Sequence, residues 1–320
     1  MPVLVKALLG DGVLKDVPGL LAKVGCSLIC GPKNQLQSQL LTGYPWQLLN
    51  LVEYFRDDPT VAQKTLNYVS SIGCVYKCRF CYETTYKYRW SHIEAIDLLN
   101  DIENLVLTYG INGIKFYDAD WFISLRRAKA FVDGLSERAI NIRWAASINP
   151  NDVLRARRQV PKLLDGLAAS GCSRLLMGVE SGSDRVLADI VKKEVTRNQI
   201  VDVAREIAAA GILGSYTFIV GFPGETTQEQ DATYSLIDEL DNLSPRPESR
   251  VHLFAPYPGT PLFDVSLEHG FRPPNSFEEW SNFDYYASQT PWTDDTFVER
   301  ARRATRMTLM PTPITGGMES

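Results

Sequence analysis

The sequence predicts an α/β fold in which six strands alternate with helices. Short runs rich in β-branched and aromatic residues recur from residue 64 onward, and amphipathic stretches of helical length separate them. Strands that alternate with helices usually pair in parallel, because each helix carries the chain back across the sheet in a right-handed crossover. Six such units form either a doubly wound sheet or an incomplete barrel.

The expected strands are Thr65–Ser71, Gly113–Tyr117, Ile142–Ser147, Ser173–Val179, Ser215–Gly221 and Ser249–Phe254. Several of the stretches between them begin with the signature of a capping box. In this motif a Ser or Thr side chain and a Glu or Gln three residues later cap the first helical turn reciprocally. The pairs are Ser91 with Glu94, Thr196 with Gln199, and Thr227 with Gln230.

The two ends of the chain have a less regular pattern. Glycine and proline interrupt residues 1–60, where Cys26–Cys30 is the one plausible short strand, so this part is predicted to be an irregular, linker-like segment. Residues 61–260 would form the α/β domain. A proline-rich run at 256–261 stops regular structure, and 261–320 would form a C-terminal extension with a helix from about Thr296 to Leu309.

Composition and charge exclude several classes of protein. The chain has 33 basic and 38 acidic residues and a net charge of −5, which offers no broad positive surface for nucleic acid. The apolar start is interrupted by Lys6, which argues against a signal peptide, and the long uncharged stretches contain Gln, Gly and Pro. We therefore expect a cytoplasmic protein without a membrane span and with reduced thiols.

Three of the six cysteines, Cys74, Cys78 and Cys81, lie within eight residues of one another, directly after the first expected strand. Three thiolates on one loop can turn toward a soft metal centre. A structural zinc site is the alternative, and its fourth ligand would have to be His92 or Cys172. Cys26 and Cys30 could bind another metal, but buried thiols of a strand are the favoured interpretation.

The spacing CxxxCxxC, with Phe80 before the last cysteine, resembles the signature of radical S-adenosylmethionine enzymes. The resemblance covers roughly residues 64–260 and favours the incomplete barrel, a partial (βα)6 TIM-like barrel. It implies a 4Fe–4S cluster held by Cys74, Cys78 and Cys81, with one iron open to S-adenosylmethionine. It also implies a 5′-deoxyadenosyl radical that abstracts hydrogen from a small-molecule substrate, and an electron donor such as flavodoxin or ferredoxin.

The same resemblance implies contacts to S-adenosylmethionine at the ends of the other strands. Asp118 would face the methionyl amino group, a role for which Asp120 competes. Where related enzymes often carry an arginine, this chain has Ser147 or Asn149 for the methionyl carboxylate. The remaining expected contacts are Phe80 beside the cluster, Glu180 and Ser181 at the ribose or the carboxylate end, and Ile219 and Gly221 at the adenine.

The strings GVESG, GFPGET and HLFAPYPGTPL resemble the group of radical S-adenosylmethionine enzymes that carry a cobalamin-binding domain. That domain would lie upstream, and none of His92, His252 and His269 sits in the DxHxxG string that such domains often offer. Cobalamin therefore has no binding motif in this chain. The resemblance leaves three alternatives: a natural short form, a separate cobalamin protein as partner, or no cobalamin.

Two further alternatives stay open. A tRNA-modifying enzyme is disfavoured by the acidic balance, because the basic clusters at 155–158 and 300–306 are short and are better explained as solvated helix faces. A non-catalytic metal-binding partner or structural subunit, which keeps the barrel without turnover, is the second function to be weighed against methylation, cyclisation or oxidative rearrangement of a small molecule.

Overall fold

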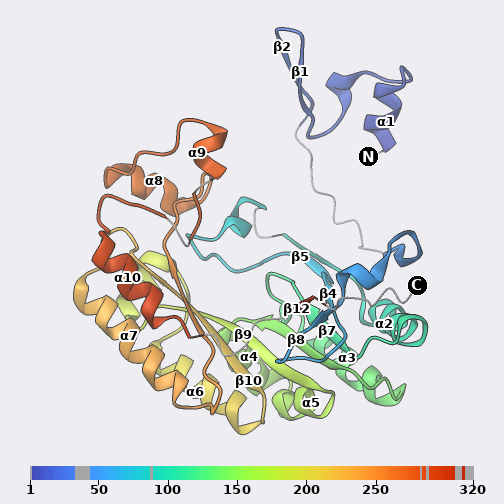
Figure 1. Cartoon of the computed structure of the whole chain (residues 1–320), viewed down its shortest axis with the longest axis vertical. Helices are drawn as coiled ribbons and strands as arrows, with labels where there is room; N and C mark the ends of the chain where they lie inside the picture. The colour runs from blue at the N-terminus through green and yellow to red at the C-terminus, as the bar shows by residue number, and fades with distance from the viewer. Residues whose placement is uncertain are drawn as a thin grey trace. The chain divides into compact units, whose positions relative to one another are not determined.

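The computed structural model describes residues 2–32, 44–86, 89–281, 283–285, 288–306 and 312–313. The chain divides into two compact units, Met1–Gln39 and Leu40–Ser320, which are treated separately here (Figure 1). In the described part of the chain, no helix has the length and apolar character needed to cross a membrane.

The first unit contains helix α1 (Pro2–Leu8) and an antiparallel hairpin of β1 (Leu21–Val24) and β2 (Ser27–Cys30). Gly25 has a φ of +60° in the two-residue turn between the strands, a conformation that tight hairpin turns require. The expected strand near Cys26–Cys30 is present. The expected burial of its thiols is wrong: Cys26 and Cys30 are both exposed, since Cys26 lies in the turn of the hairpin and Cys30 at the exposed end of β2.

The second unit is built on an eight-stranded sheet in the order β11-β10-β9-β8-β7-β4-β3-β12. The six predicted strands are confirmed, with boundaries shifted by one to three residues, and they pair in parallel along the sheet. They are β4 (Thr65–Tyr68), β7 (Gly113–Phe116), β8 (Arg143–Ile148), β9 (Cys172–Glu180), β10 (Leu213–Val220) and β11 (Ser249–Leu253). Two antiparallel strands that were not predicted, β3 (Arg56–Asp57) and β12 (Thr312–Pro313), extend the β4 edge.

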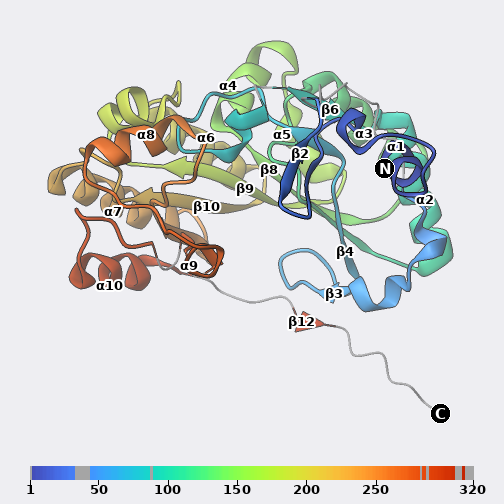
Figure 2. The same cartoon turned by 90° about the horizontal axis from the view of Figure 1, so that it is seen from above.

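Helices cover the outer side of this curved sheet, so the strands form a partial barrel (Figures 1 and 2). These helices are α2 (Ala95–Tyr109), α3 (Leu125–Glu137), α4 (Pro150–Gln159), α5 (Leu163–Ala169), α6 (Arg197–Ala209) and α7 (Thr227–Asp241). Large aromatic side chains fill the layer between sheet and helices: Phe116, Trp144 and Phe131 form edge-on pairs with centroids 5.6 to 6.1 Å apart. The predicted α/β fold class and partial barrel are confirmed.

Only one of the three predicted capping boxes is confirmed. Thr196 and Gln199 cap α6 reciprocally. At α7 the box is shifted by one residue to Thr226 and Glu229, because the helix begins at Thr227. The third prediction is wrong, since Ser91 lies in a strand and Glu94 precedes α2 without a side-chain cap.

Part of the predicted linker-like segment packs on the barrel. Trp46 and Phe55 are buried, and they belong to a stretch with two short 3-10 turns, Trp46–Leu48 and Leu51–Tyr54. The indole of Trp46 and the hydroxyl of Tyr68 both donate hydrogen bonds to Asp101 on α2, at 2.8 and 2.6 Å. These contacts join the segment before the first barrel strand to the outer helical layer.

The C-terminal extension is helical, with α8 (Pro261–Glu268), α9 (Phe277–Ser281) and α10 (Asp295–Ala304). The predicted last helix ends five residues early, because Thr305 is extended and Arg306 pairs with Ser249 as an isolated bridge. Arg306 is therefore not part of this helix, and residues 307–309 lie outside the described residues. The hydroxyl of Thr305 accepts a hydrogen bond from the amide of Val251, and the carbonyl of Tyr285 accepts one from Leu253. The extension thereby covers the free edge of β11.

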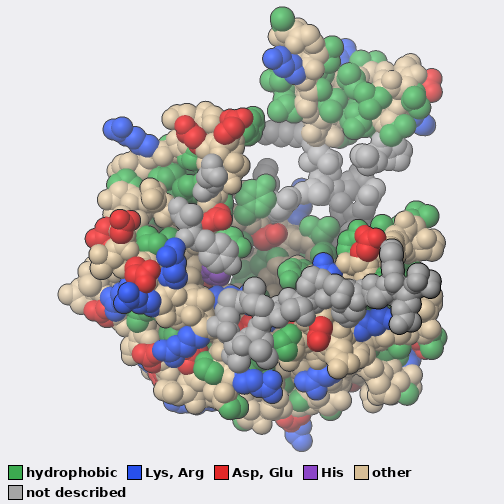
Figure 3. Space-filling model, viewed as in Figure 1, with side chains coloured by type: hydrophobic (Ala, Val, Ile, Leu, Met, Phe, Trp, Pro, Cys, Tyr) green, Lys and Arg blue, Asp and Glu red, His purple; other side chains and the backbone are tan. Residues whose placement is uncertain are grey.

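Charged side chains of both signs are interspersed over the face of the molecule in Figure 3. The arginines of α10 follow this pattern, since Arg300 pairs with Asp231 and Arg303 with Glu299. A solvated helix face, as expected from the sequence, accounts for Arg300, Arg302 and Arg303, whereas Arg306 lies beyond the helix and pairs with the buried Asp241.

A small hairpin that was not predicted closes the base of the cysteine loop. Strands β5 (Ser71–Gly73) and β6 (Trp90–His92) pair antiparallel, with Gly73 opposite Trp90. Gly73 has a φ of +89°, and a Cβ atom at this position would lie 1.9 Å from the carbonyl oxygen of Arg89. Only glycine fits this close approach of two backbones.

We expect Gly73→Ala to lower the free energy of unfolding by about 3 kcal/mol or more, because it adds a backbone clash to the cost of the positive φ. Gly211→Ala is the matched control: its φ is +75°, but no atom lies within 4 Å of the added Cβ, so about 1 kcal/mol is expected. Chemical denaturation of both variants measures the difference. Equal losses would show that the contact with Arg89 contributes nothing.

Candidate functional site

Cys74, Cys78 and Cys81 lie on the loop that follows β4 and β5, at the carboxyl end of the first barrel strand. All three side chains are partly buried. Burial raises the pKa of Cys74 to about 12 and that of Cys81 to about 11, and charge on the neighbouring cysteines contributes in the same direction. The thiols therefore stay protonated at neutral pH until a metal displaces the protons.

Backbone hydrogen bonds fix the shape of this loop. The amide of Cys81 donates to the carbonyl of Cys78 at 3.0 Å, and a 3-10 turn, η4 (Tyr82–Tyr86), follows. The amide of Arg79 donates to Val191, and its carbonyl accepts from Leu262. The middle of the cysteine loop is thus held between the segment after β9 and the start of α8.

An apolar wall surrounds one side of the loop. Phe80 packs on Phe222 with ring centroids 6.0 Å apart, and Phe222 packs on Phe254 at 5.2 Å. Cys78 and Ile219 contact the same cluster. A wall of this kind restricts water around a metal centre, which influences its reduction potential.

Asp118 is buried and anchors the base of the loop. Its carboxylate accepts hydrogen bonds from the amide and hydroxyl of Ser70, both at 2.7 Å, and from the hydroxyl of Ser71 at 2.6 Å. The buried guanidinium of Arg127 donates to the same Ser70 hydroxyl at 2.6 Å. The structure therefore places Asp118, the first sequence candidate for the methionyl amino group, inside a hydrogen-bond network of the protein.

Asp120 is equally buried but keeps one oxygen without a partner in the described structure. Its Oδ1 accepts from the amide of Phe122 at 3.0 Å, whereas its Oδ2 has no hydrogen bond. Burial, and then the nearby carboxylate of Asp152, raises the pKa of Asp120, and the charge of Asp120 in turn raises the pKa of Cys74. Asp120 thus lies within electrostatic reach of Cys74, and its Oδ2 has no donor in the described structure, where the neighbouring side chain is the carboxyl group of Asp152.

Glu180, at the end of β9, has a φ of +68° and is buried. The ammonium of Lys193 donates to its carboxylate at 3.0 Å. Burial disfavours the charge of Lys193, but the carboxylate of Glu180 beside it favours that charge and the pKa of Lys193 is raised. The pair therefore lies beside Cys78 and also within electrostatic reach of Asp120.

Lys193 was missed by the sequence analysis. It stands in the run Lys192-Lys193-Glu194, which is typical of a solvated surface. The structure brings it inward because a π-helical turn, η5 (Val186–Val191), ends at Lys192 in a left-handed conformation. Turns of this kind are frequent at functional sites, but no sequence signal announces this one.

The other predicted contacts fall into two sets. Ser147 and Ile219 are half-buried on alternating, inward-facing positions of their strands. Ser181 is fully buried, bonds to Thr233 at 3.1 Å, and accepts from the amide of Ser183, so it serves the local turn. Asn149 caps α4.

Gly221 is required by its backbone rather than by space for a ligand. Its φ is +84°, and a Cβ atom would meet Thr293 and Phe297 of the C-terminal extension at 3.1 Å. Its carbonyl accepts a hydrogen bond from the indole of Trp292 at 2.8 Å. The structure thus connects Gly221 to the C-terminal extension.

The donor set suits an iron–sulfur cluster. Within the described ranges, no three side chains of His, Cys, Asp or Glu converge on one point where a single ion could bind. In a 4Fe–4S cluster each cysteine binds a different iron, so three thiols spread around one loop match such a cluster in type and number. Three thiols would leave the fourth iron of such a cluster without a protein ligand, and Asp120 is a buried acid whose Oδ2 has no donor in the described structure.

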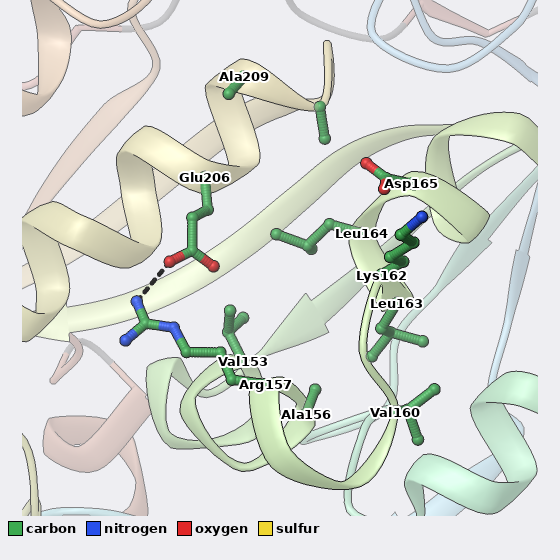
Figure 4. A pocket seen from close by; sticks show the side chains of 11 residues that line it. Val153, Ala156, Arg157, Val160, Lys162, Leu163, Leu164, Asp165, Glu206 and Ala209 are labelled. Carbon is green, nitrogen blue, oxygen red and sulfur yellow. Dashed lines mark hydrogen bonds and ion pairs between the residues drawn. The ribbon is translucent and has the colours of Figure 1, made fainter.

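A separate cavity of about 280 Å³ lies in the outer layer between α4, α5 and α6 (Figure 4). Its lining is mainly aliphatic, including Val153, Val160 and Leu164, and Arg157 forms an ion pair with Glu206 across it. It contains none of the residues discussed above, so the site belongs to the inner side of the barrel.

Comparison with known families decides the assignment. The model of the Radical SAM superfamily matches residues 68–237, more than half of the chain, and this range contains all three cysteines. The chain belongs to the radical SAM superfamily. Enzymes of this superfamily use a 4Fe–4S cluster and S-adenosylmethionine, so both expected cofactors are those of the family.

Among its relatives, this radical SAM chain is 24% identical over 237 residues to an uncharacterized methyltransferase of Pyrococcus horikoshii. The match covers 74% of this chain and 49% of the relative, so the chain spans about half of that protein.

Solved structures share the fold. One is the cobalamin-dependent S-adenosylmethionine radical enzyme OxsB, with a TM-score of 0.62 and 20% identity, covering 73% of this chain and 34% of the other. Another is the radical S-adenosylmethionine methyltransferase TsrM of Kitasatospora setae, with a TM-score of 0.61 and 19% identity, covering 85% and 53%. At this identity the likeness concerns the fold of the radical SAM barrel.

Glu225, in the turn after β10, is the best-defined titrating group near this site. Its carboxylate accepts from the amides of Gly221 and Phe222 at 2.6 and 3.2 Å. Burial raises its pKa to about 7, from an ordinary 4.5. Between these values the folded chain holds a proton that the unfolded chain has lost, so stability falls as pH rises through this window.

Glu225→Gln keeps an oxygen for both amides and removes the titration. We expect the melting temperature of the variant, relative to that of the unmodified chain, to rise between pH 5 and pH 8. Exposed Glu268→Gln is the control and should give a constant difference. Thermal unfolding at closely spaced pH values measures both. A constant difference for Glu225→Gln would contradict the raised pKa.

Proposed function

We propose that this barrel binds a 4Fe–4S cluster through Cys74, Cys78 and Cys81, and binds S-adenosylmethionine at the open iron. The observation that carries the proposal is the placement of three partly buried thiols and one buried acid with a free oxygen, Asp120, at the carboxyl end of the barrel strands. Ligands of parallel α/β barrels bind at this end, where the βα loops gather.

The bound cofactors supply a 5′-deoxyadenosyl radical through reductive cleavage of S-adenosylmethionine. The protein's own residues orient and shield them. Asp120 would accept hydrogen bonds from the methionyl ammonium, whose charge restores the ionised carboxylate. Lys193 would offset negative charge beside Cys78, and the apolar wall of Phe80, Phe222 and Phe254 would keep water away.

A small molecule is the proposed substrate, and methylation is the proposed reaction, ahead of cyclisation or oxidative rearrangement. The methyltransferases among the relatives support this choice. The inner side of the barrel supports a small substrate, since Ser147, Gly178 and Thr217 are inward-facing positions that are not fully buried.

An acidic electron-transfer protein, such as flavodoxin or ferredoxin, is the proposed electron donor. A surface groove of about 730 Å³ beside the cysteine loop is lined by four basic residues and two acidic ones, namely Lys77, Arg79, Lys192, Lys193, Asp184 and Glu194. Two of these residues lie between Cys74 and Cys81 in the sequence, so a partner bound there would approach the cluster. Complementary charge favours rapid, weak association, which suits electron transfer.

Cobalamin, if the reaction uses it, is proposed to come from a separate protein. Of the two solved structures described above, one is a cobalamin-dependent enzyme and the other contains bound cobalamin. Equilibrium dialysis with hydroxocobalamin, with and without a candidate partner, separates binding by this chain from binding by the partner.

Cys78→Ala tests the cluster. After anaerobic reconstitution with iron and sulfide, the unmodified chain should be brown and release 5′-deoxyadenosine from S-adenosylmethionine under reduction. The variant should lose at least tenfold in this release and should bind less iron per chain, since one of three ligands is gone. Iron and sulfide analysis with electron paramagnetic resonance measures the loss.

Cys172→Ala is the matched control, because Cys172 is a buried thiol on β9 and lies outside the loop. It should keep iron and activity. A colourless, inert unmodified chain with one tightly bound zinc would overturn the proposal and favour a structural metalloprotein. Equal loss in both variants would point to damage to the fold.

Asp120→Asn and Asp118→Asn separate the two acids. Asp120→Asn should weaken binding of S-adenosylmethionine to the reconstituted protein about tenfold or more, because a charge-assisted hydrogen bond is lost. Asp118→Asn should change this affinity less than threefold and instead lower stability, because an amide group cannot accept all the bonds from Ser70 and Ser71.

Anaerobic calorimetry gives the affinity, and denaturation gives the stability. The reverse result, with binding lost only in Asp118→Asn, would assign the ammonium to Asp118 and overturn the role proposed for Asp120.

A further inference from the structure

The inner side of the barrel is open rather than packed. On β9, β10 and β11 every second residue near the site is half-buried, while its neighbours are fully buried. Because side chains alternate across a strand, the half-buried set faces the inside of the barrel. This set consists of Leu176, Gly178, Thr217, Ile219, Arg250 and His252. Closed barrels fill these positions with bulky side chains.

A cavity of about 120 Å³ lies on this inner side. Its lining includes Lys115 of β7, Ser147 of β8, Arg174 and Leu176 of β9, and Arg250 of β11. At about 30 Å³ per water molecule, it has room for about four waters or one small polar group.

Positive charge exceeds negative charge around the cavity. The guanidinium groups of Arg174 and Arg250 both donate to the buried carboxylate of Glu248, at 3.1 and 2.9 Å. The ammonium of Lys115 lies 3.1 Å from Asp58. Three cations therefore share two carboxylates, which leaves one positive charge in excess.

A third carboxylate, that of Asp118, also lines the cavity, but it does not neutralise the excess positive charge. Its oxygens accept hydrogen bonds from Ser70 and Ser71, and the guanidinium of Arg127 lies close enough to favour its ionised form.

Each arginine also keeps a buried donor without an acceptor. Arg174 is only 4% exposed, yet its Nε has no hydrogen bond in the described structure, and the Nε of Arg250 is in the same state. A buried donor without a partner costs free energy comparable to a lost hydrogen bond. An oxygen anion in the cavity would satisfy both groups and neutralise the excess charge.

We propose that this cavity binds an anionic group of the substrate, either a carboxylate or a phosphate. The four residue steps from Leu176 to Glu180 span about 13 Å along β9 at 3.3 Å per residue. A substrate anchored by its anion at Arg174 and Arg250 would thus extend toward Glu180 and the cysteine loop. The anion site is inferred from the cavity alone. Only the orientation of the substrate toward the cysteine loop rests on the proposed function.

The test uses the full chain without cluster or S-adenosylmethionine, so it does not depend on radical chemistry. Thermal unfolding is followed during titration with inorganic phosphate, and separately with acetate, against sodium chloride at equal ionic strength. Binding to the folded state raises the melting temperature with ligand concentration. Phosphate or acetate should stabilise the chain beyond chloride, and the stronger of the two identifies the group.

Arg250→Gln should weaken the apparent affinity at least tenfold. Glu248 keeps Arg174 as its partner in this variant, so the fold should persist. Arg250→Lys is the second variant; it keeps the charge but removes the Nε donor, and it should also bind more weakly than the unmodified chain. Arg302→Gln is the control, because Arg302 is exposed on α10 and pairs with Glu299.

Equal effects of both anions and chloride would overturn the proposal and indicate a cavity filled by water. So would equal loss in Arg302→Gln and Arg250→Gln, which would place the anion on the surface. Failure of cluster reconstitution would leave these results unchanged, so the two proposals fail separately.

Discussion

The buried carboxylate of Asp118 connects the parts of the barrel on which the site depends. It ties Ser70 and Ser71, where the chain leaves β4, to the end of β7, and Arg127 adds helix α3 to the same network. A buried charge with several donors is strongly oriented, whereas a buried charge with a missing donor is costly. The cysteine loop therefore begins at a fixed point between two strands and a helix.

Burial sets the protonation of the groups around the cysteine loop. The same exclusion of water raises the pKa of Cys74, Cys81 and Asp120, while the carboxylate of Glu180 raises the pKa of the buried Lys193 that donates to it. Neutral, protonated thiol and carboxyl groups cost little free energy in a buried environment. A cationic partner stabilises their deprotonated, charged forms. In the proposed function, these groups at the end of the barrel bind positively charged ligands, namely iron and a sulfonium compound with an ammonium group.

The sequence was sufficient for the six strands and the cysteine loop, because both depend on local patterns: β-prone runs between helices, and three cysteines in a fixed spacing. It was insufficient where a side chain's role depends on distant partners. Asp118 and Asp120 look alike in the sequence, and only the serines of another strand distinguish them. The inward position of Lys193 depends on the turn after β9, and the exposure of Cys26 and Cys30 depends on how a small hairpin packs. Neither feature leaves a local pattern in the sequence.

The C-terminal extension has a consequence for the open barrel. A sheet that does not close leaves two edges whose free amides can recruit strands from other molecules and start aggregation. Here the outward amides of Ser249, Val251 and Leu253 are taken in turn by Arg306, Thr305 and Tyr285. At the other edge β12 ends in Pro313, which has no amide to offer. The extension thus takes the place, at the β11 edge, of the strands that would close a full barrel. The barrel keeps an opening for ligands, while the amides of this edge strand are not available for pairing with another molecule.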